Sequence, residues 1–347
     1  MCHRAARALA LLAVLAALAA ACAPRPAAPS QAAADPAPPP ASAAPTEAPH
    51  KHVLVAYPSP SLSYFPLFVG WKEGLFAAEG LDLEWTQLQS NLMISAMLAG
   101  EVDYGTSFSS IIRAAATGAD VRAILATVDR PQHSFVVPAA ITSGEQLRGK
   151  RIGVNSLGGV QEYEAYEVLA RYGLGRSDAT ISGIAADTAR LQALQAGALD
   201  AAVIGMPFDL VAEDQGMRVL VRLSDIIELT HAGVGTTTAK LRDAPDEVRG
   251  FLRASLRGVD LTKHDKATAV RHMEDWLDMS PDVASRAYDA AVLTWSDMGI
   301  APEAGLQLDL AEVKAQTGAS EDIPIASVVD YTPLREATRD LGRPPLP

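Results

Sequence analysis

The sequence predicts an α/β protein built from two similar lobes, and three observations carry this prediction. From Val53 onward, short apolar runs alternate with apolar stripes at helical spacing, which is typical of strands alternating with helices. The phrase at 98–103 ends a predicted helix and opens a predicted strand, and a similar phrase recurs 97 residues later at 195–200. With 347 residues, 49% of them hydrophobic, the chain can fill two cores.

Each element follows from its local pattern. Pro66 is placed as the first residue of a helix, whereas Gly233 to Gly235 predicts a turn or hinge. In the first lobe we expect strands at 53–57, 81–85, 102–104 and 121–128, and helices from 66, at 91–99 and at 109–116. In the second we expect strands at 151–154, 180–184, 201–204 and 218–222, and helices at 159–172, at 188–196 and from 207. The part after Gly235 reads as mostly helical.

Residues 1–21 predict an export signal. Arg4 and Arg7 precede 14 uncharged residues at 8–21, all Ala, Leu or Val. A signal-peptide core takes about 7 to 15 apolar residues, whereas a membrane-spanning helix needs roughly 20. The mature protein is therefore expected to work outside the cytoplasm, in the cell envelope.

Cys22 follows a run of small residues and resembles the lipidated cysteine of the bacterial lipobox. Ala19 stands where that pattern usually has leucine, so cleavage by the ordinary signal peptidase, giving a plain secreted protein, stays open. Residues 22–50 are rich in Ala and Pro and cannot form a core. We expect them to form an extended linker between a lipid anchor and the folded body, on the periplasmic or extracellular side of a membrane.

Composition excludes several function classes. A formal charge of -12 argues against nucleic acid as a partner. The two cysteines, Cys2 and Cys22, both precede the body, which therefore has no thiol nucleophile or zinc-cluster ligand. The seven histidines form no H-x-x-x-H pair, and neither a nucleophile elbow nor a phosphate-binding loop is present. We expect no enzyme activity, no metal and no cofactor.

The segments at 66–76, 79–83, 98–105, 147–154 and 194–203 together resemble the periplasmic solute-binding proteins of the nitrate, sulfonate, taurine and thiamine-precursor type. The resemblance implies a two-lobed periplasmic-binding-protein fold (type II-like), with a ligand cleft between the lobes. It also implies that the protein delivers a small-molecule solute to an ABC permease, whose transmembrane subunits work with a cytoplasmic ATPase. The resemblance further implies a monomer.

The same resemblance sets the expected lobe boundaries. We place the first part of lobe 1 at 53–138, lobe 2 at 139–232, and the helical completion of lobe 1 at 233–343. The two crossovers between the lobes are expected near 136–140 and 228–234.

Ligands of open α/β sheets gather at the carboxyl ends of strands, where helix N-termini offer N–H donors. Polar residues at such places are also common helix caps. The resemblance favours ligand contacts at the loop after the first strand and at the first helix start of the second lobe. The predicted ligand-binding residues are Ser61, Ser63, Tyr64, Asn91, Ser107, Ser109, Ser156, Gly158, Gly159, Gln161, Pro207, Phe208 and Asp209.

The sequence leaves the solute open. Helix termini and hydroxyls could hold an anion, whereas aromatic faces such as Tyr64, Tyr163 and Phe208 with Asp209 could hold a flat amine or heterocycle. Two other functions remain as alternatives. One is a ligand sensor that docks on a membrane receptor, and the other is a pyrimidine-precursor synthase, whose Cys-rich, His-bearing active site this body lacks.

Overall fold

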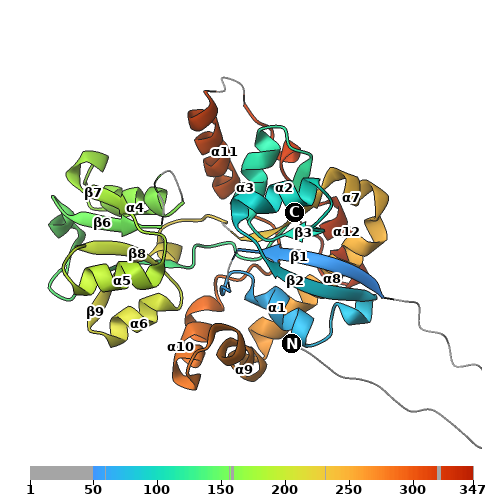
Figure 1. The fold of residues 1–347 in the computed structure, drawn as a ribbon, viewed down its shortest axis with the longest axis horizontal. Helices are drawn as coiled ribbons and strands as arrows, with labels where there is room; N and C mark the ends of the chain where they lie inside the picture. The colour runs from blue at the N-terminus through green and yellow to red at the C-terminus, as the bar shows by residue number, and fades with distance from the viewer. Residues whose placement is uncertain are drawn as a thin grey trace, which may run out of the picture. The chain divides into compact units, whose positions relative to one another are not determined.

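The computed structural model describes residues 50–58, 60–155, 157, 160–230, 232–318 and 322–346. The predictions on Cys22, Ser156, Gly158 and Gly159 lie outside these residues. The described residues belong to one compact unit, Ala48–Pro347, which contains two separate sheets (Figure 1).

The first lobe is built on a five-stranded sheet in the order β2-β1-β3-β10-β4. β1 pairs in parallel with β2 and β3, while β10 runs antiparallel to β3 and β4. Its strands are β1 (Lys51–Tyr57), β2 (Leu81–Gln87), β3 (Tyr104–Gly105), β4 (Val121–Ala126) and β10 (Gly233–Thr237).

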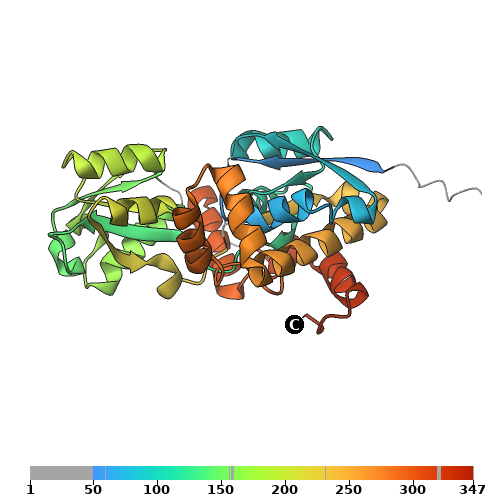
Figure 2. The same cartoon turned by 90° about the horizontal axis from the view of Figure 1, so that it is seen from below.

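Helices from both ends of the chain cover this sheet, and Figure 2 shows the C-terminal ones, in orange to red, gathered on the first lobe. The longest helix buries an apolar stripe that includes Val248, Phe251 and Leu256. The helices are α1 (Phe65–Lys72), α2 (Ser90–Leu98), α3 (Phe108–Ala116), α7 (Thr238–Asp243), α8 (Pro245–His264), α9 (Lys266–Leu277), α10 (Pro281–Ala291), α11 (Glu303–Thr317) and α12 (Thr332–Asp340), with short 3-10 turns η1 (Ala77–Glu79) and η5 (Ile325–Ser327).

The second lobe has its own five-stranded sheet, in the order β7-β6-β8-β5-β9. Separate apolar clusters lie on its two faces, one including Phe135, Val154 and Leu169 and the other including Leu191 and Ile204. The elements are β5 (His133–Pro138), η2 (Gly144–Leu147), β6 (Arg151–Val154), α4 (Val160–Arg171), η3 (Arg176–Asp178), β7 (Thr180–Gly183), α5 (Asp187–Gln195), β8 (Ala201–Gly205), α6 (Phe208–Asp214), β9 (Met217–Arg222) and η4 (Leu223–Asp225).

The repeated phrase marks equivalent positions in the two lobes. Gly100 and Gly197 both adopt the left-handed conformation, with φ of 75° and 68°, which glycine tolerates at helix ends. Asp103 then accepts a hydrogen bond from the backbone N–H of Leu54 (2.8 Å), and Asp200 accepts one from Arg151 (3.0 Å). Each aspartate therefore clamps the first parallel strand of its own lobe.

Two strands differ from the predictions. The segment His133–Pro138 pairs with β8 and β9 as an antiparallel strand of the second sheet, so the chain has already crossed before His133 and not at 136–140. Gly233 to Gly235 is not a turn but part of β10. A Cβ at Gly233 would lie 2.2 Å from the carbonyl oxygen of Leu125 and one at Gly235 would lie 2.6 Å from that of Arg122, so close strand approach explains both glycines.

The chain thus crosses twice between the lobes. The first passage, residues 127–132, connects β4 to β5, and the second passage runs from η4 to β10, overlapping the expected 228–234. The lobes also touch through α6: Leu210 joins the first-lobe core, and Asp214 pairs with Arg286 of α10 at 2.8 Å.

Candidate functional site: the space between the lobes

The passages join corresponding edges of the two sheets. β1, β2 and β3 are parallel, and β4 ends beside the start of β10, with Ala126 opposite Gly233. In the second lobe, β8 ends where β5 begins, with Gly205 opposite His133. These are the carboxyl edges at which α/β proteins bind ligands. The predicted loops therefore lie along two edges that the passages connect.

Ser63 belongs to a buried network that connects the lobes. Its Oγ donates to Oε1 of Gln132 (2.8 Å), and Nε2 of Gln132 donates to Oγ1 of Thr294 (2.7 Å). The three residues are 4%, 3% and 2% exposed. The carbonyl of Gln132 also accepts from the backbone N–H of Met206 in the second lobe (2.9 Å). Ser63 therefore stabilises the first passage, and its predicted contact with ligand stays a prediction.

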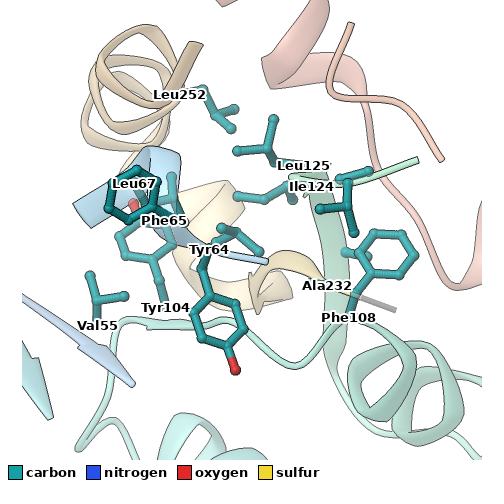
Figure 3. Close-up of a cluster of buried hydrophobic side chains, with 14 of the residues drawn as sticks. Val55, Tyr64, Phe65, Leu67, Tyr104, Phe108, Ile124, Leu125, Ala232 and Leu252 are labelled. Carbon is teal, nitrogen blue, oxygen red and sulfur yellow. The ribbon is translucent and has the colours of Figure 1, made fainter. Parts of the chain in front are cut away.

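The other predicted ligand-binding residues of the first lobe differ in burial and in their contacts. Ser61 accepts from the backbone N–H of Ser63 (3.1 Å), which shapes the loop after β1. Tyr64 is 6% exposed and packs in the first-lobe core, and Figure 3 shows its hydroxyl directed away from the other labelled side chains. Asn91 lies in the first turn of α2. Ser107 lies with its Oγ 2.7 Å from that of Ser90, so two predicted helix starts meet at one edge.

In the second lobe, the predicted Gln161 holds the loop after β6, because its Oε1 accepts from the backbone N–H of Asn155 (2.9 Å). Beside it, Nδ1 of His133 lies 2.9 Å and 2.8 Å from the two carboxylate oxygens of the fully buried Glu164. Burial alone would lower the pKa of His133, but Glu164, helped by Asp187, raises it above its ordinary value. The pair places a charged group at the start of β5, beside the interlobe network.

Asp209 lies in the first turn of α6. Its carboxylate is fully buried and accepts hydrogen bonds from Ser134 (2.7 Å) and Arg222 (3.0 Å). Through these hydrogen bonds, Asp209 connects α6 to β5 and β9. Pro207 precedes α6, and Phe208 is partly buried against the cluster on one face of the second sheet. The sequence predicts these three as ligand-binding residues because they follow a strand, and their contact with ligand stays a prediction.

A cavity of about 230 Å³ opens between the lobes beside these edges. Its second-lobe wall comes from α4 and the start of η3, and its first-lobe wall comes from α3 and α11, with the second passage between them. Tyr163, which the sequence analysis named as a possible aromatic contact, lines this cavity. The lining residues are Arg113, Val160, Glu162, Tyr163, Tyr166, Arg176, Leu229, Leu308, Asp309, Ala311 and Glu312.

The second-lobe wall is aromatic, and its charges are partnered. The hydroxyl of Tyr166 donates to Glu162 (2.9 Å), and the guanidinium of Arg176 lies 4.3 Å from the centre of the Tyr166 ring. Burial, together with Glu167 beside the hydroxyl, raises the pKa of Tyr163 to about 12. Both tyrosines are therefore neutral at physiological pH and offer ring surface to a ligand.

The first-lobe wall carries the buried carboxylate of Asp309, which is 6% exposed. The predicted Ser109 supports it: Oγ of Ser109 donates to Oδ2 of Asp309 (3.2 Å) and lies 3.4 Å from the carbonyl oxygen of Thr230. Burial raises the pKa of Asp309 to about 6, although Arg113 and the Ser109 hydrogen bond act to lower it. Ser109 thus positions a side chain of the cavity.

The sequence reasoning missed the α11 wall. Asp309 shares a helix face with Leu306, Leu310 and Val313, all of which are buried. A carboxylate inside an apolar stripe was the available signal, since an unpaired charge is costly to bury. Its partner, Ser109, is 200 residues away, so the local pattern could not show which cavity it faces.

Two structural findings concern other kinds of site. The described residues contain no group of three or more His, Cys, Asp or Glu side chains able to hold a metal ion. Within the same part of the chain, no helix has the length and apolar character needed to cross a membrane.

Comparisons with known proteins bear on the fold and the family. The periplasmic sulfonate-binding protein SsuA of Methylobacillus flagellatus has a similar structure, with a TM-score of 0.68 at 16% identity over 86% of this chain and 98% of that chain. The desulfurization enzyme DszB shares the fold with a TM-score of 0.64 at 13% identity, over 84% of this chain and 100% of that chain. The expected periplasmic-binding-protein fold is confirmed. Because the same fold also occurs in an enzyme, it does not decide the function.

Among curated proteins, the riboflavin-binding protein RibY of Chloroflexus aurantiacus is 28% identical over 208 residues. This match covers 58% of the present chain and 59% of RibY. The family model described as NMT1/THI5 like matches residues 62–269, more than half of the chain. This match includes both passages and the whole of the second lobe. The resemblance seen in the sequence is thereby confirmed: the chain belongs to the NMT1/THI5-like family.

Proposed function

We propose that the protein is the solute-binding component of an ABC importer, exported to the cell envelope, where it captures a small organic or anionic solute between its lobes. The observation that carries the proposal is the cavity whose walls come from both lobes. A solute held there contacts α4 of one lobe and α3 and α11 of the other, so it stabilises the closed arrangement over an open one.

Family membership and the compared proteins support this proposal. RibY is by name a riboflavin-binding protein and SsuA a sulfonate-binding one, so flavins and alkanesulfonates are the first solute classes to test. The enzyme alternative has less support, because the described residues include no cysteine and His133 is paired with the fully buried Glu164.

The direct test is thermal unfolding of the full-length chain with riboflavin, alkanesulfonates, taurine, nitrate and aminopyrimidines. We expect one class to raise the melting temperature. Uptake of that solute by cells should then require both this protein and a permease with its ATPase. Binding without any role in uptake would favour the sensor alternative, whereas a folded protein that no solute stabilises would contradict the proposal.

We further propose that Cys22 is lipidated and that residues 22–50 tether the body to the membrane. The chain provides its own control, because its other cysteine, Cys2, precedes the apolar run. Cells fed a labelled fatty acid should label the wild type and Cys2→Ser equally, and Cys22→Ser not at all. Label retained by Cys22→Ser would contradict the lipid anchor and support plain secretion.

A further inference from the structure

The lobes touch along α6 of the second lobe and α10 of the first, which lie side by side (Figure 1). Met206, just before α6, and Leu210 within it are buried in the apolar core of the first lobe. Asp214, the last residue of α6, pairs with Arg286 in the middle of α10. The residues that line the cavity come from neither helix, so this contact joins the lobes at a second place.

The ion pair at this contact is well formed. Nη1 of Arg286 lies 2.8 Å and 2.9 Å from the two carboxylate oxygens of Asp214. Asp282, one turn earlier on α10, lies 3.6 Å from the same nitrogen and helps to orient the guanidinium. The side chains of Asp214 and Arg286 are 50% and 36% exposed, so the pair is accessible to salt and tolerant of substitution. No other ion pair among the described residues joins the two lobes.

The opposite end of α6 is fixed at the first passage. The carbonyl oxygen of Gln132 accepts from the backbone N–H of Met206, and the side chain of Gln132 donates to Thr294 (2.7 Å). Thr294 in turn donates to the carbonyl oxygen of Ala291, the last residue of α10 (2.6 Å). α6 therefore begins beside the end of α10 and extends along it as far as Arg286.

This arrangement makes the ion pair sensitive to rotation of one lobe against the other. α6 has seven residues, which at about 1.5 Å per residue place Asp214 roughly 10 Å from the start of the helix. A rotation of about 20° about that start would move the carboxylate by about 3.5 Å, out of contact with Arg286. The ion pair is therefore kept only while the lobes hold the present angle.

We propose that the ion pair of Asp214 and Arg286 is a latch that stabilises the present arrangement of the lobes when no solute is bound. In this arrangement both walls of the cavity are in place, and separation of the lobes breaks the pair. The inference goes beyond the proposed function, because it concerns the balance between two arrangements of the lobes and assigns no solute. An exposed ion pair contributes modestly, so the latch adjusts this balance and does not lock it.

The test measures the distance between the lobes in the full-length chain without solute. Both native cysteines precede the body, so Cys2→Ser and Cys22→Ser give a parent protein free of thiols. Spin labels are then attached at Ser95→Cys of the first lobe and Glu145→Cys of the second, both exposed positions, and double electron–electron resonance gives the populations of the lobe arrangements. Asp214→Arg places two guanidinium groups together, and we expect it to increase the population with separated lobes roughly 2- to 5-fold.

Asp214→Arg combined with Arg286→Asp exchanges the two charges and should restore the parental distances. Asp289→Arg is the matched control, since Asp289 is an exposed carboxylate of the same α10 that pairs with Lys266 of α9 within the first lobe (2.6 Å). It should leave the distances unchanged. If Asp214→Arg does not fold, Asp214→Asn removes the charge without repulsion and should shift the populations in the same direction.

Salt gives a second measurement that needs no substitution in the ion pair. The screening length is about 3 Å in 1 M salt, so 1 M NaCl should increase the separated population of the parent and reduce its difference from Asp214→Arg.

Unchanged distances in Asp214→Arg and in 1 M NaCl would overturn the inference. A change that Asp289→Arg reproduces, or that the charge exchange does not reverse, would overturn it as well. These distances are measured without solute, so the two proposals fail separately. A folded chain that no solute stabilises contradicts the proposed function alone, whereas intact solute binding with no effect of Asp214→Arg on the lobes contradicts the latch alone.

Discussion

Asp309 shows how burial at a single residue couples the site to pH. Its pKa is raised from 3.8 to about 6, so between these values the native state binds more protons than the unfolded state. Stability must then fall as pH rises from about 4 to 7, by up to about 3 kcal/mol from this group.

We expect Asp309→Asn to lose this pH dependence, because the amide does not titrate. The measurement is the free energy of unfolding in urea at pH 4, 5, 6 and 7, compared between variant and wild type. Relative to the wild type, the free energy of unfolding of Asp309→Asn should increase from pH 4 to pH 7. A constant difference would mean that Asp309 titrates normally in the folded protein.

His133 and Glu164 give a second prediction in which stability again falls as pH rises. The pKa of His133 is raised, so its stabilising contribution is complete below the ordinary value of about 6.5 and is lost as pH rises through the folded pKa. His133→Asn leaves a fully buried carboxylate without its partner, which typically costs about 3 to 5 kcal/mol.

Urea unfolding at pH 6 and pH 9 checks this. The deficit of His133→Asn should be larger at pH 6, and adding Glu164→Gln should recover part of it, because the uncompensated charge is then removed. A deficit of the same size at both pH values would show that packing and not charge is responsible.

At the scale of elements, the first-lobe core depends on close contact between α1 and α8. A Cβ at Gly258 of α8 would lie 2.5 Å from the carbonyl oxygen of Pro66 and 3.3 Å from Cα of Gly70. Backbone atoms cannot move aside as a side chain can, so Gly258→Ala should destabilise the protein by about 1 to 3 kcal/mol.

Gly250, two turns earlier in the same helix, is the matched control. The nearest atom to a Cβ there is Cβ of Glu79 at 3.5 Å, an ordinary contact. Gly250→Ala should stabilise by about 0.5 to 1 kcal/mol, because alanine favours the helix. Equal effects of the two substitutions in urea unfolding would contradict the proposed α1 and α8 packing.

At the scale of the whole molecule, a solute that binds between the lobes stabilises both of them through one site. With the solute at a hundredfold excess over its Kd, the free energy of unfolding should rise by about 2.7 kcal/mol, and by about 1.4 kcal/mol for each further tenfold. Small-angle scattering should show a smaller radius of gyration with solute than without. Stabilisation with unchanged dimensions would place the solute in a site that does not draw the lobes together.

The sequence alone predicted the fold class, the two-lobed repeat and most elements, because apolar periodicity, helix caps and glycine ends are written in neighbouring residues. The equivalence of Asp103 and Asp200 was visible as a repeated phrase, although their clamping of the first strands was not. The composition also indicated the export signal and the linker, and both stay predictions.

Only the tertiary structure decided what depends on partners far apart in the chain. β5 and β10 became strands by pairing with β8, β9 and β4, which no local pattern specifies, and this moved the first passage ahead of His133. Ser63 and Asp209 are polar residues after strands, as a ligand site requires, and only folding gives them their hydrogen-bond partners Gln132 and Arg222. The cavity wall at Asp309 depends on a helix that packs on α3 from some 200 residues away. Burial and charge become meaningful for function only when folding brings such distant groups together.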